Sequence, residues 1–200
     1  MNRFENGLLQ YLSKKQLKKI QSVKIGIGGA GGIGSNIVII LARCGFKNFE
    51  MLDFDLIEES NLNRQQFFIG DIGTIKIDSL KNFLIKINPD INITAHLVKW
   101  ELDKANLYFK DCDYIVEAFD QAAYKRSFVE YYQSKAKAVV SGNGMSGLKK
   151  KKPMTIKKVD NIYMVGDLST DSAEGHPPLA PRITACAAMM AEIILDLVLN

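Results

Sequence analysis

Residues 23–36 read VKIGIGGAGGIGSN, and this stretch decides the class of fold. Six glycines fall between Gly26 and Gly34. The β-branched residues before them predict a short strand, and the apolar run after them predicts a helix to about Cys44, with Gly45 as its C-terminal cap. A glycine-rich turn between a strand and a helix is typical of a phosphate-binding site, because bare backbone and the free N–H groups of a helix start can approach an anion closely.

The glycines fit the dinucleotide fingerprint G-x-G-x-x-G in two overlapping frames. The frame over residues 26–31 leaves only three residues for the preceding strand. The frame over residues 29–34 lets the strand run through Gly28 and predicts that the helix opens at Gly34. We therefore favour the second frame, and a turn that merely packs tightly is the less favoured interpretation.

The composition is that of one globular domain covering residues 1–200. Apolar residues make up 47% and charged residues 24%, and a net charge of +4 without a basic helix gives no reason to expect nucleic acid binding. Three isolated cysteines without a C-x-x-C pair favour a reducing cytoplasm and predict neither a disulfide nor a zinc site. The first residues do not read as a signal peptide, and no apolar run is long enough to cross a membrane.

Strand and helix patterns alternate along most of the chain. Residues 1–22 form an expected N-terminal helical segment, and residues 143–181 an irregular crossover region that contains a hairpin turning at Asp160–Asn161. The alternation predicts a Rossmann-like, doubly wound, mostly parallel sheet with helices on both faces. The expected strands are 23–27, 49–53, 91–99, 114–119, 138–141, 154–160 and 162–166, and the expected helices are 34–44, 74–88, 103–110, 122–135 and 182–199.

The residues after the second strand indicate which nucleotide is bound. Residues 52–66 read LDFDLIEESNLNRQQ, unlike the corresponding part of a dehydrogenase. Asp53 ends a strand where an acid accepts hydrogen bonds from ribose hydroxyls, and Asp120 ends the strand in YIVEAFD at the same sheet edge. Two cations, Arg64 and Lys76, suit a triphosphate, and an acid at a strand end suits Mg²⁺. The sequence thus predicts a MgATP site.

Five motifs, GAGGIGS, LDFD, SNLNRQ, IGTIK and EAFDQ, follow one another between about residues 23 and 142. In their order and spacing the sequence resembles the ThiF/MoeB family, bacterial relatives of the ubiquitin-activating enzymes. It is most similar to the compact ThiF-type proteins of thiamine biosynthesis. The resemblance implies a homodimeric adenylyltransferase that uses MgATP to activate the C-terminal glycine carboxylate of a ubiquitin-fold sulfur carrier ending in Gly-Gly.

The resemblance also implies roles for individual residues. Arg64, Lys76 and Asp120 are the expected catalytic residues, with Asp120 as the ligand of Mg²⁺. The family's usual Asp-Asn pair is Asp120–Gln121 in this sequence. The full set expected to bind ATP is Gly29, Gly31, Gly32, Gly34, Asp53, Asp55, Asn61, Asn63, Arg64, Gln65, Lys76 and Asp120.

Several family features are missing or ambiguous. No cysteine occurs in residues 143–181, and Cys186 reads as a core residue, so we expect adenylation without a covalent thiol step on this chain. Arg3 fits either the family's N-terminal arginine, which acts on the partner subunit's ATP, or a disordered terminal residue. The lysines Lys149–Lys152 fit a solvated loop or a surface for an acidic carrier, and Arg182 fits either packing or guidance of the carrier tail.

Two other functions remain open on the sequence. A nicotinamide-dependent oxidoreductase needs only the glycine turn and Asp53, but no proton-transfer residue or substrate domain is evident. A non-catalytic nucleotide-binding module would keep the same site without turnover. His96 and Trp100 read as structural residues.

Overall fold

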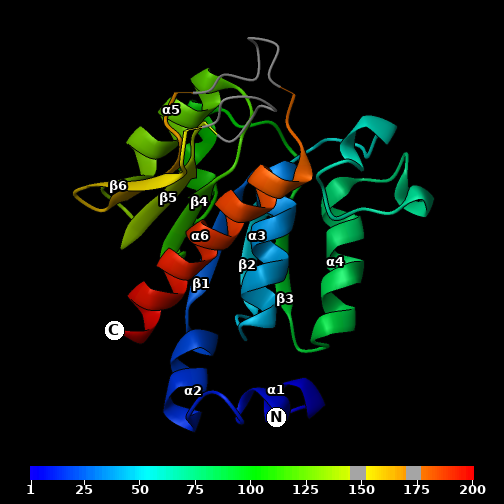
Figure 1. Cartoon of the computed structure of the whole chain (residues 1–200), viewed down its shortest axis with the longest axis vertical. Helices are drawn as coiled ribbons and strands as arrows, with labels where there is room; N and C mark the ends of the chain where they lie inside the picture. Colours follow the sequence, from blue (N-terminus) through cyan, green and yellow to red (C-terminus); the bar gives the residue numbers. More distant parts are fainter. Residues whose placement is uncertain (145–151, 170–176) are drawn as a thin grey trace.

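A single sheet organises the molecule. The computed structural model describes residues 1–144, 152–169 and 177–200, and within these residues seven strands are joined in the order β3-β2-β1-β4-β5-β7-β6 (Figure 1). Every neighbouring pair is parallel except β6 and β7. The mostly parallel sheet is therefore confirmed. The strands are β1 (Lys24–Gly28), β2 (Asn48–Leu52), β3 (Asn92–His96), β4 (Tyr114–Glu117), β5 (Ala138–Gly142), β6 (Thr155–Val159) and β7 (Ile162–Gly166).

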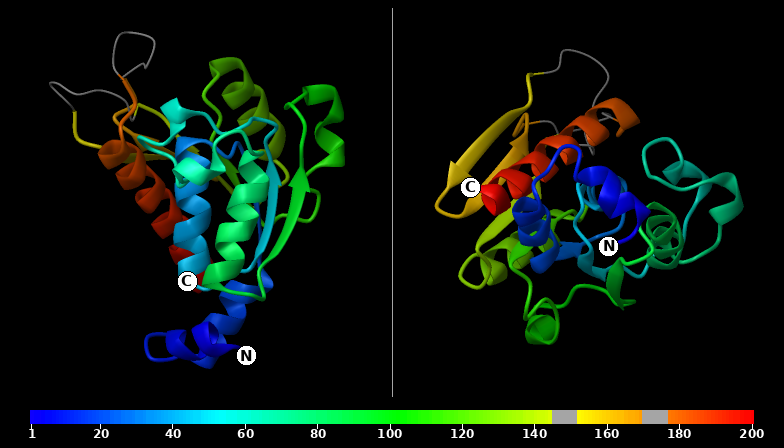
Figure 2. Two further views of the ribbon diagram at one scale, coloured as in Figure 1. Left: turned by 90° about the vertical axis from the view of Figure 1, so that its right-hand side faces the viewer. Right: turned by 90° about the horizontal axis from the view of Figure 1, so that it is seen from below.

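Helices cover both faces of this sheet, as expected for a doubly wound fold. Helices α3, α4 and α6 pack on one face, and α5 with the 3-10 segment η3 packs on the other (Figures 1 and 2). The α-helices are α1 (Arg3–Leu8), α2 (Lys14–Ser22), α3 (Gly32–Arg43), α4 (Lys76–Ile87), α5 (Ala122–Tyr132) and α6 (Ala180–Leu199), and the 3-10 segments are η1 (Glu59–Asn61), η2 (Ile69–Asp71) and η3 (Leu102–Leu107).

Strand β1 contains two glycines for a packing reason. Ile25 and Ile27 are fully buried in the cluster that includes α3 and α6. The alternate positions face the other layer, where a Cβ on Gly26 would lie 2.8 Å from the ring of Phe109, and one on Gly28 2.7 Å from Phe128. Because aromatic rings lie directly on the strand backbone, only glycine fits at these positions. The prediction that both glycines belong to the strand is confirmed.

Helix α3 begins earlier than predicted. Its first residue is Gly32, and Gly31 is the N-cap, so the expected opening at Gly34 is wrong by two residues. Gly34 lies in the first turn of the helix. It must be glycine because a Cβ there would come within 1.8 Å of the carbonyl oxygen of Gly29. Gly29 itself has φ +96°, a left-handed conformation that favours glycine. Two different constraints thus select glycines that look alike in the sequence.

Three other predicted elements differ from the observed ones in where they begin or end, or in the type of helix. Helix α4 begins at Lys76 rather than at residue 74, and the strand expected over 91–99 is only Asn92–His96. This strand lies at the sheet edge and none of its residues is buried, so packing does not extend it. The helix expected over 103–110 is the 3-10 segment η3. Short polar segments carry little hydrophobic periodicity, which explains these errors.

The hairpin and the N-terminal helices form as predicted. Strands β6 and β7 pair antiparallel around Asp160, whose φ is +52°. Asn2 and Ser13 cap α1 and α2 with reciprocal capping boxes. Helix α1, which carries Arg3, lies beyond the amino ends of the strands, at the opposite end of the molecule from the loops that follow β1 and β4 (Figure 1). Arg3 therefore takes no part in its own chain's site at the carboxyl edge.

Candidate functional site

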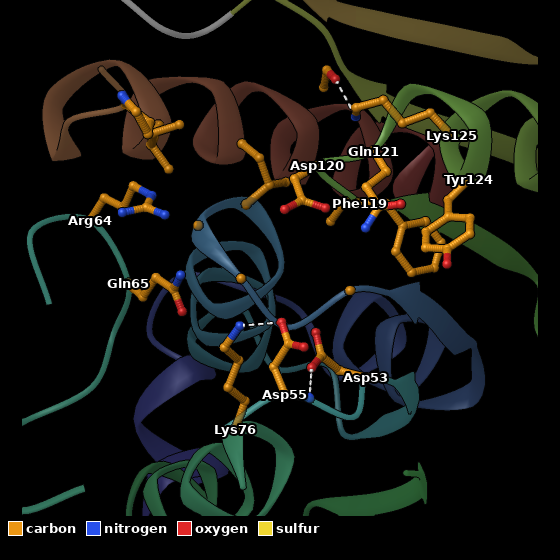
Figure 3. Close-up of a pocket in the computed structure, with 18 of the residues that line it drawn as sticks. Asp53, Asp55, Arg64, Gln65, Lys76, Phe119, Asp120, Gln121, Tyr124 and Lys125 are labelled. Atoms are coloured by element: carbon orange, nitrogen blue, oxygen red, sulfur yellow. Dashed lines mark hydrogen bonds and ion pairs between the residues drawn. The ribbon is translucent and has the colours of Figure 1, made fainter. Parts of the chain in front are cut away.

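The main cavity lies at the carboxyl edge of the sheet, where the strand order changes direction. The chain proceeds from β1 to β2 on one side and returns to β4 on the other, which creates the crevice in which open α/β sheets bind ligands. The cavity has a volume of about 790 Å³ and is lined by the ends of β1, β2, β4 and β5, by part of segment 54–65 and by the starts of α5 and α6. Figure 3 shows charged side chains from several of these elements around it.

The glycine turn forms one wall. Gly29, Gly31 and Gly32 line the cavity, whereas Gly34 supports the turn from behind and is not part of the lining. A Cβ placed on Gly31 would meet only Gln65 Nε2, 3.9 Å away. The N-cap of α3 makes no side-chain hydrogen bond, so its first N–H groups are left for another acceptor. The backbone at the helix start is thus open to an anion.

Asp53 holds this turn in place. One carboxylate oxygen accepts a hydrogen bond from Ala30 N at 2.6 Å and the other from Asp55 N at 2.8 Å. Burial raises the pKa of Asp53 above its ordinary value, and the two backbone hydrogen bonds oppose this shift. Each carboxylate oxygen retains capacity for another donor, so the residue can both fix the turn and accept a hydrogen bond from a hydroxyl.

Lys76 reaches the cavity from the first residue of α4. Its side chain is only 7% exposed, and its ammonium group lies 2.7 Å from Asp55 Oδ2 (Figure 3). The backbone N–H of Lys76 also donates to the carbonyl of Asp55. An ammonium group has three donors, and Asp55 occupies one of them among the described residues. Lys76 can therefore donate to a phosphate without leaving its acid partner.

Asn36 anchors the segment that carries Arg64. Asn36 is 2% exposed, and its amide donates to the carbonyls of Gly32 at 2.7 Å and Arg64 at 2.9 Å. Its oxygen accepts from Gln66 Nε2 and from Thr184 Oγ1 in α6. One buried amide thus joins α3, α6 and the irregular segment. Such fully satisfied buried groups fix a unique arrangement of loops.

Neighbouring residues of segment 54–65 differ in whether their side chains line the cavity. Arg64 lines the cavity, and its Nη1 donates to Ser60 O and Asn63 Oδ1 at 2.9 and 2.8 Å. Burial lowers the pKa of Arg64, while the charge of Asp120 raises it. Asn63 is exposed and does not line the cavity; its amide bonds instead to the carbonyl of Pro178. Asn63, which the sequence predicted to bind ATP, thus supports Arg64 from outside the cavity lining.

Two buried amides complete this wall. Asn61 is 7% exposed and accepts a hydrogen bond from Glu58 N. Gln65 is 8% exposed, and its Oε1 is buried with no hydrogen-bond partner among the described residues. An unpaired buried amide oxygen is costly, so its position in the cavity lining fits a polar ligand.

Asp120 lies in the turn between β4, which ends at Glu117, and Gln121, the N-cap of α5. Its carboxylate is exposed, accepts no hydrogen bond from the described residues, and extends into the cavity in the direction of Arg64 (Figure 3). A free carboxylate at a strand end fits a hydrated Mg²⁺ that is held mainly by phosphate oxygens. Within the described residues no three His, Cys, Asp or Glu side chains form a metal site of their own.

Two charged residues near Asp120 in the chain, one in β4 and one in α5, were not identified from the sequence. Glu117 is fully buried, and both of its carboxylate oxygens bind Lys125, at 3.1 and 2.9 Å. Lys125 lines the cavity. The only signals in the sequence were an acid at the end of an apolar strand and a lysine in the first turns of the next helix.

An aromatic end lies beside Asp53. Phe54, Trp100, Phe119 and Tyr124 line this part of the cavity, and Lys99 lies 4.9 Å from the centre of the Phe54 ring. Trp100 is 3% exposed and donates to Ser127 Oγ, which confirms a structural role but adds a place in the lining. His96 binds Glu50 on the η3 side of the sheet.

The cysteines lie away from this cavity. None of them lines it, and Cys186 is fully buried in α6 with its thiol directed at the carbonyl of Val165. Burial raises the pKa of Cys186 to about 12, and burial also raises the pKa values of Cys44 and Cys112. The prediction that Cys186 is a core residue is confirmed.

The crossover region is described only in part. Arg182 forms an ion pair with buried Asp167, at 2.8 Å, which favours the packing role over the alternative. Lys149–Lys151 lie outside the described residues, so the lysine run stays untested, as does the long loop at residues 170–176. Of the helices in the described residues, none combines the length and apolar character needed to cross a membrane.

Fold and cavity together define a Rossmann-like domain with a site built for a phosphorylated nucleotide. The family model for the ThiF family matches residues 5–200, so the chain belongs to the ThiF family. This result confirms the resemblance read from the five motifs.

Curated proteins similar to the chain include a SUMO-activating enzyme subunit and an adenylyltransferase. It is 37% identical over 128 residues to SUMO-activating enzyme subunit 2 of Dictyostelium discoideum, covering 63% of this chain and 19% of the relative. It is 28% identical over 187 residues to the adenylyltransferase and sulfurtransferase UBA4 of Scheffersomyces stipitis, covering 89% and 39%. The chain thus spans well under half the length of these curated relatives.

Solved structures share the whole fold at low identity. The tRNA N6-threonylcarbamoyladenosine dehydratase TcdA of E. coli, in complex with ATP, matches with a TM-score of 0.84 and 19% identity, covering 98% of this chain and 93% of that one. E. coli MccB with ATP matches with a TM-score of 0.75 and 21% identity, covering 99% and 64%. At these identities the likeness establishes the Rossmann-like fold alone.

Proposed function

We propose that this protein is an ATP-dependent adenylyltransferase that activates the C-terminal carboxylate of a ubiquitin-fold carrier protein. The observation that carries the proposal is the meeting of the α3 N-terminus, Arg64, Lys76 and Asp120 in one cavity. Two cations, a helix start and a free acid suit a magnesium-bound triphosphate better than the pyrophosphate of a dinucleotide. Membership in the ThiF family supports the same choice over a nicotinamide-dependent oxidoreductase.

Each part of the cavity has a place in this reaction. The aromatic end beside Asp53 suits adenosine, with the Asp53 carboxylate on the ribose hydroxyls. Gly31, Gly32, Arg64 and Lys76 suit the phosphates, and Asn61 and Gln65 offer polar contacts to them. Asp120 would hold Mg²⁺, which supplies positive charge to the triphosphate when bound.

The chain needs no nucleophile of its own. A carrier carboxylate oxygen forms a bond to the α-phosphorus, the bond from that phosphorus to the β-phosphate oxygen breaks, and pyrophosphate leaves. The residues named above then contribute by orienting ATP and balancing charge on the phosphates. None of the three cysteines lines the cavity, which supports a reaction that ends at the acyl-adenylate on this chain.

The names of similar proteins support the kind of substrate but not its identity. SUMO-activating enzyme subunit 2 and UBA4 are named for a modifier and for sulfur transfer. We propose a sulfur carrier ending in Gly-Gly, of the ThiS kind used in thiazole synthesis for thiamine, and a cytoplasmic homodimer as the working form. The resemblance of its five motifs to the ThiF-type proteins of thiamine biosynthesis is the basis for this finer proposal.

ATP–pyrophosphate exchange tests the function. Radiolabelled pyrophosphate should enter ATP only when a purified ubiquitin-fold carrier ending in Gly-Gly is present, and removal of its last glycine should abolish exchange. Arg64→Ala and Asp120→Ala should each reduce exchange at least 100-fold, whereas Arg126→Ala, at an exposed ion pair on α5, should leave it within twofold. Full exchange by Arg64→Ala would refute the assignment of this cavity as the catalytic site. Binding of ATP without exchange for every carrier would instead favour a non-catalytic module.

A further inference from the structure

The backbone of residues 142–144 forms a part of the cavity wall that has few side chains. Gly142 is the last residue of β5, Asn143 and Gly144 follow it, and all three line the cavity. Gly144 has φ +75°, and a Cβ there would lie 2.3 Å from Asp167 Oδ1. Both conformation and space therefore require glycine at this position. The wall continues directly into the crossover region.

A first buried ion pair holds one end of this wall. Lys125 Nζ donates to both carboxylate oxygens of Glu117 and, at 3.0 Å, to the carbonyl of Gly142. Glu117 Oε2 also accepts from Ser141 Oγ at 2.6 Å, and Oε1 from Phe119 N at 2.7 Å. The pair thus connects the strand end at Gly142 with the turn that presents Asp120.

The donor count decides what Lys125 can do. An ammonium group has three N–H donors, and the two oxygens of Glu117 and the carbonyl of Gly142 use all three. Lys76, by contrast, has one such partner among the described residues. Although Lys125 lines the cavity, it has no donor left for a phosphate. Its position fits a structural support of the site rather than a nucleotide ligand.

A second buried ion pair holds the other end. Arg182 Nη2 lies 2.8 Å from Asp167 Oδ2 and 3.4 Å from the carbonyl of Gly144. The Asp167 side chain is fully buried, and its backbone N–H also donates to the carbonyl of Gly144 at 3.0 Å. Between the two pairs, Asn143 N donates to Val165 O at 2.8 Å. Two cations from different helices thus bind carbonyls two residues apart.

We propose that Lys125 and Arg182 are paired positioning residues that clamp the backbone of residues 142–144 as a rigid wall for the carboxyl-terminal tail of the protein substrate. The inference rests on the proposed adenylylation, and it concerns the tail rather than ATP. An extended tail of small residues needs a close and unmoving backbone surface, because a carboxylate displaced by about 1 Å reacts far more slowly. Each clamp is an ion pair with a buried acid, and the loss of either cation removes that ion pair from the acid.

Backbone hydrogen exchange tests the clamp without any reaction. Lys125→Met and Arg182→Met should each speed exchange at Asn143 N and Asp167 N at least tenfold, and Lys125→Arg should restore most of the protection. Arg126→Met, on the same helix but at an exposed pair, is the matched control and should change nothing. If Lys125→Met does not fold, the double variant Glu117→Gln/Lys125→Met removes both charges and still deprives Gly142 of its donor. Unchanged exchange at both amides would overturn the clamp.

Steady-state kinetics and ATP binding test whether the clamp serves the carrier tail rather than ATP. With a purified ubiquitin-fold carrier ending in Gly-Gly, the KM for the carrier should rise at least tenfold in Lys125→Met and Arg182→Met, while the Kd for ATP should change less than threefold. A tenfold weaker ATP affinity with an unchanged carrier KM would make Lys125 a phosphate ligand and refute the proposal. If the wild-type protein activates no carrier, the proposed function fails, whereas hydrogen exchange and ATP binding still decide whether the clamp exists.

Discussion

Gly34→Ala tests how closely the phosphate-binding turn is packed. A Cβ on Gly34 would lie 1.8 Å from the carbonyl oxygen of Gly29, whereas an ordinary van der Waals contact begins near 3.4 Å, about 1.6 Å farther. The neighbour is backbone, so no side chain can rotate away, and the turn and the start of α3 must separate. Overpacking costs about 1–3 kcal/mol where side chains can adjust, so we expect at least the upper end of that range.

Gly7→Ala is the matched control. Gly7 also lies in a helix, and a Cβ there would meet nothing within 4 Å. Since alanine is favoured over glycine in a helix interior by about 1 kcal/mol, this variant should be slightly more stable than the wild type. The two substitutions make the same chemical change, so their difference isolates the contact with Gly29.

Urea unfolding and calorimetric titration with MgATP provide the measurements. Gly34→Ala should lower the free energy of unfolding by about 3 kcal/mol and weaken ATP binding at least tenfold, equivalent to about 1.4 kcal/mol. Gly7→Ala should bind ATP normally. A Gly34→Ala variant that unfolds within about 0.5 kcal/mol of the wild type and binds ATP unchanged would refute the reasoning.

Three further predictions concern a buried amide that anchors the site, the acid that holds the glycine turn, and the buried cysteine of α6. Asn36→Ala should lower the free energy of unfolding by about 2–4 kcal/mol, because it removes four hydrogen bonds from a buried amide, whereas the exposed Asn106→Ala should change it by less than about 0.5 kcal/mol in urea titrations. As the pH is lowered, ATP affinity should begin to fall while the pH is still above 3.8, the ordinary aspartate pKa, because burial raises the pKa of Asp53 and protonation removes an acceptor. Asp53→Asn should bind ATP weakly at every pH. Cys186→Ala should retain carrier-dependent exchange, and mass spectrometry should detect no covalent adduct of the wild type with the carrier; an adduct at Cys186 would contradict this.

The sign of the Asp53 effect on stability is opposite to that of a salt-bridged acid. Because its pKa in the folded protein is raised, the folded state binds a proton more readily than the unfolded chain between pH 3.8 and the raised value. Asp53 alone therefore makes the fold more stable as the pH falls through that window, while ATP binding weakens. Opposite trends in these two measurements would separate the role of Asp53 in binding from its role in folding.

The sequence by itself determined the class of fold, and most of the residues that it predicted to bind ATP line the cavity. Alternating strand and helix patterns predicted the parallel sheet, because burial on both faces leaves apolar runs that are visible without coordinates. Residues at strand ends, Asp53 and Asp120, could be placed at one edge because parallel strands share a direction. Gln65 and Lys76 were likewise expected where the structure has them.

Only the tertiary structure decided which glycines line the cavity and which are required by close packing. Gly34 packs against Gly29, Gly26 and Gly28 lie under aromatic rings, and Gly31 faces open space. These differences depend on neighbours distant in the chain, which local pattern cannot reveal. The same holds for Lys125, whose charge suggests a phosphate ligand until Glu117 and Gly142 are seen to use all its donors. Hydrogen-bond saturation is a property of the assembled site, and a sequence gives only the residues that take part in it.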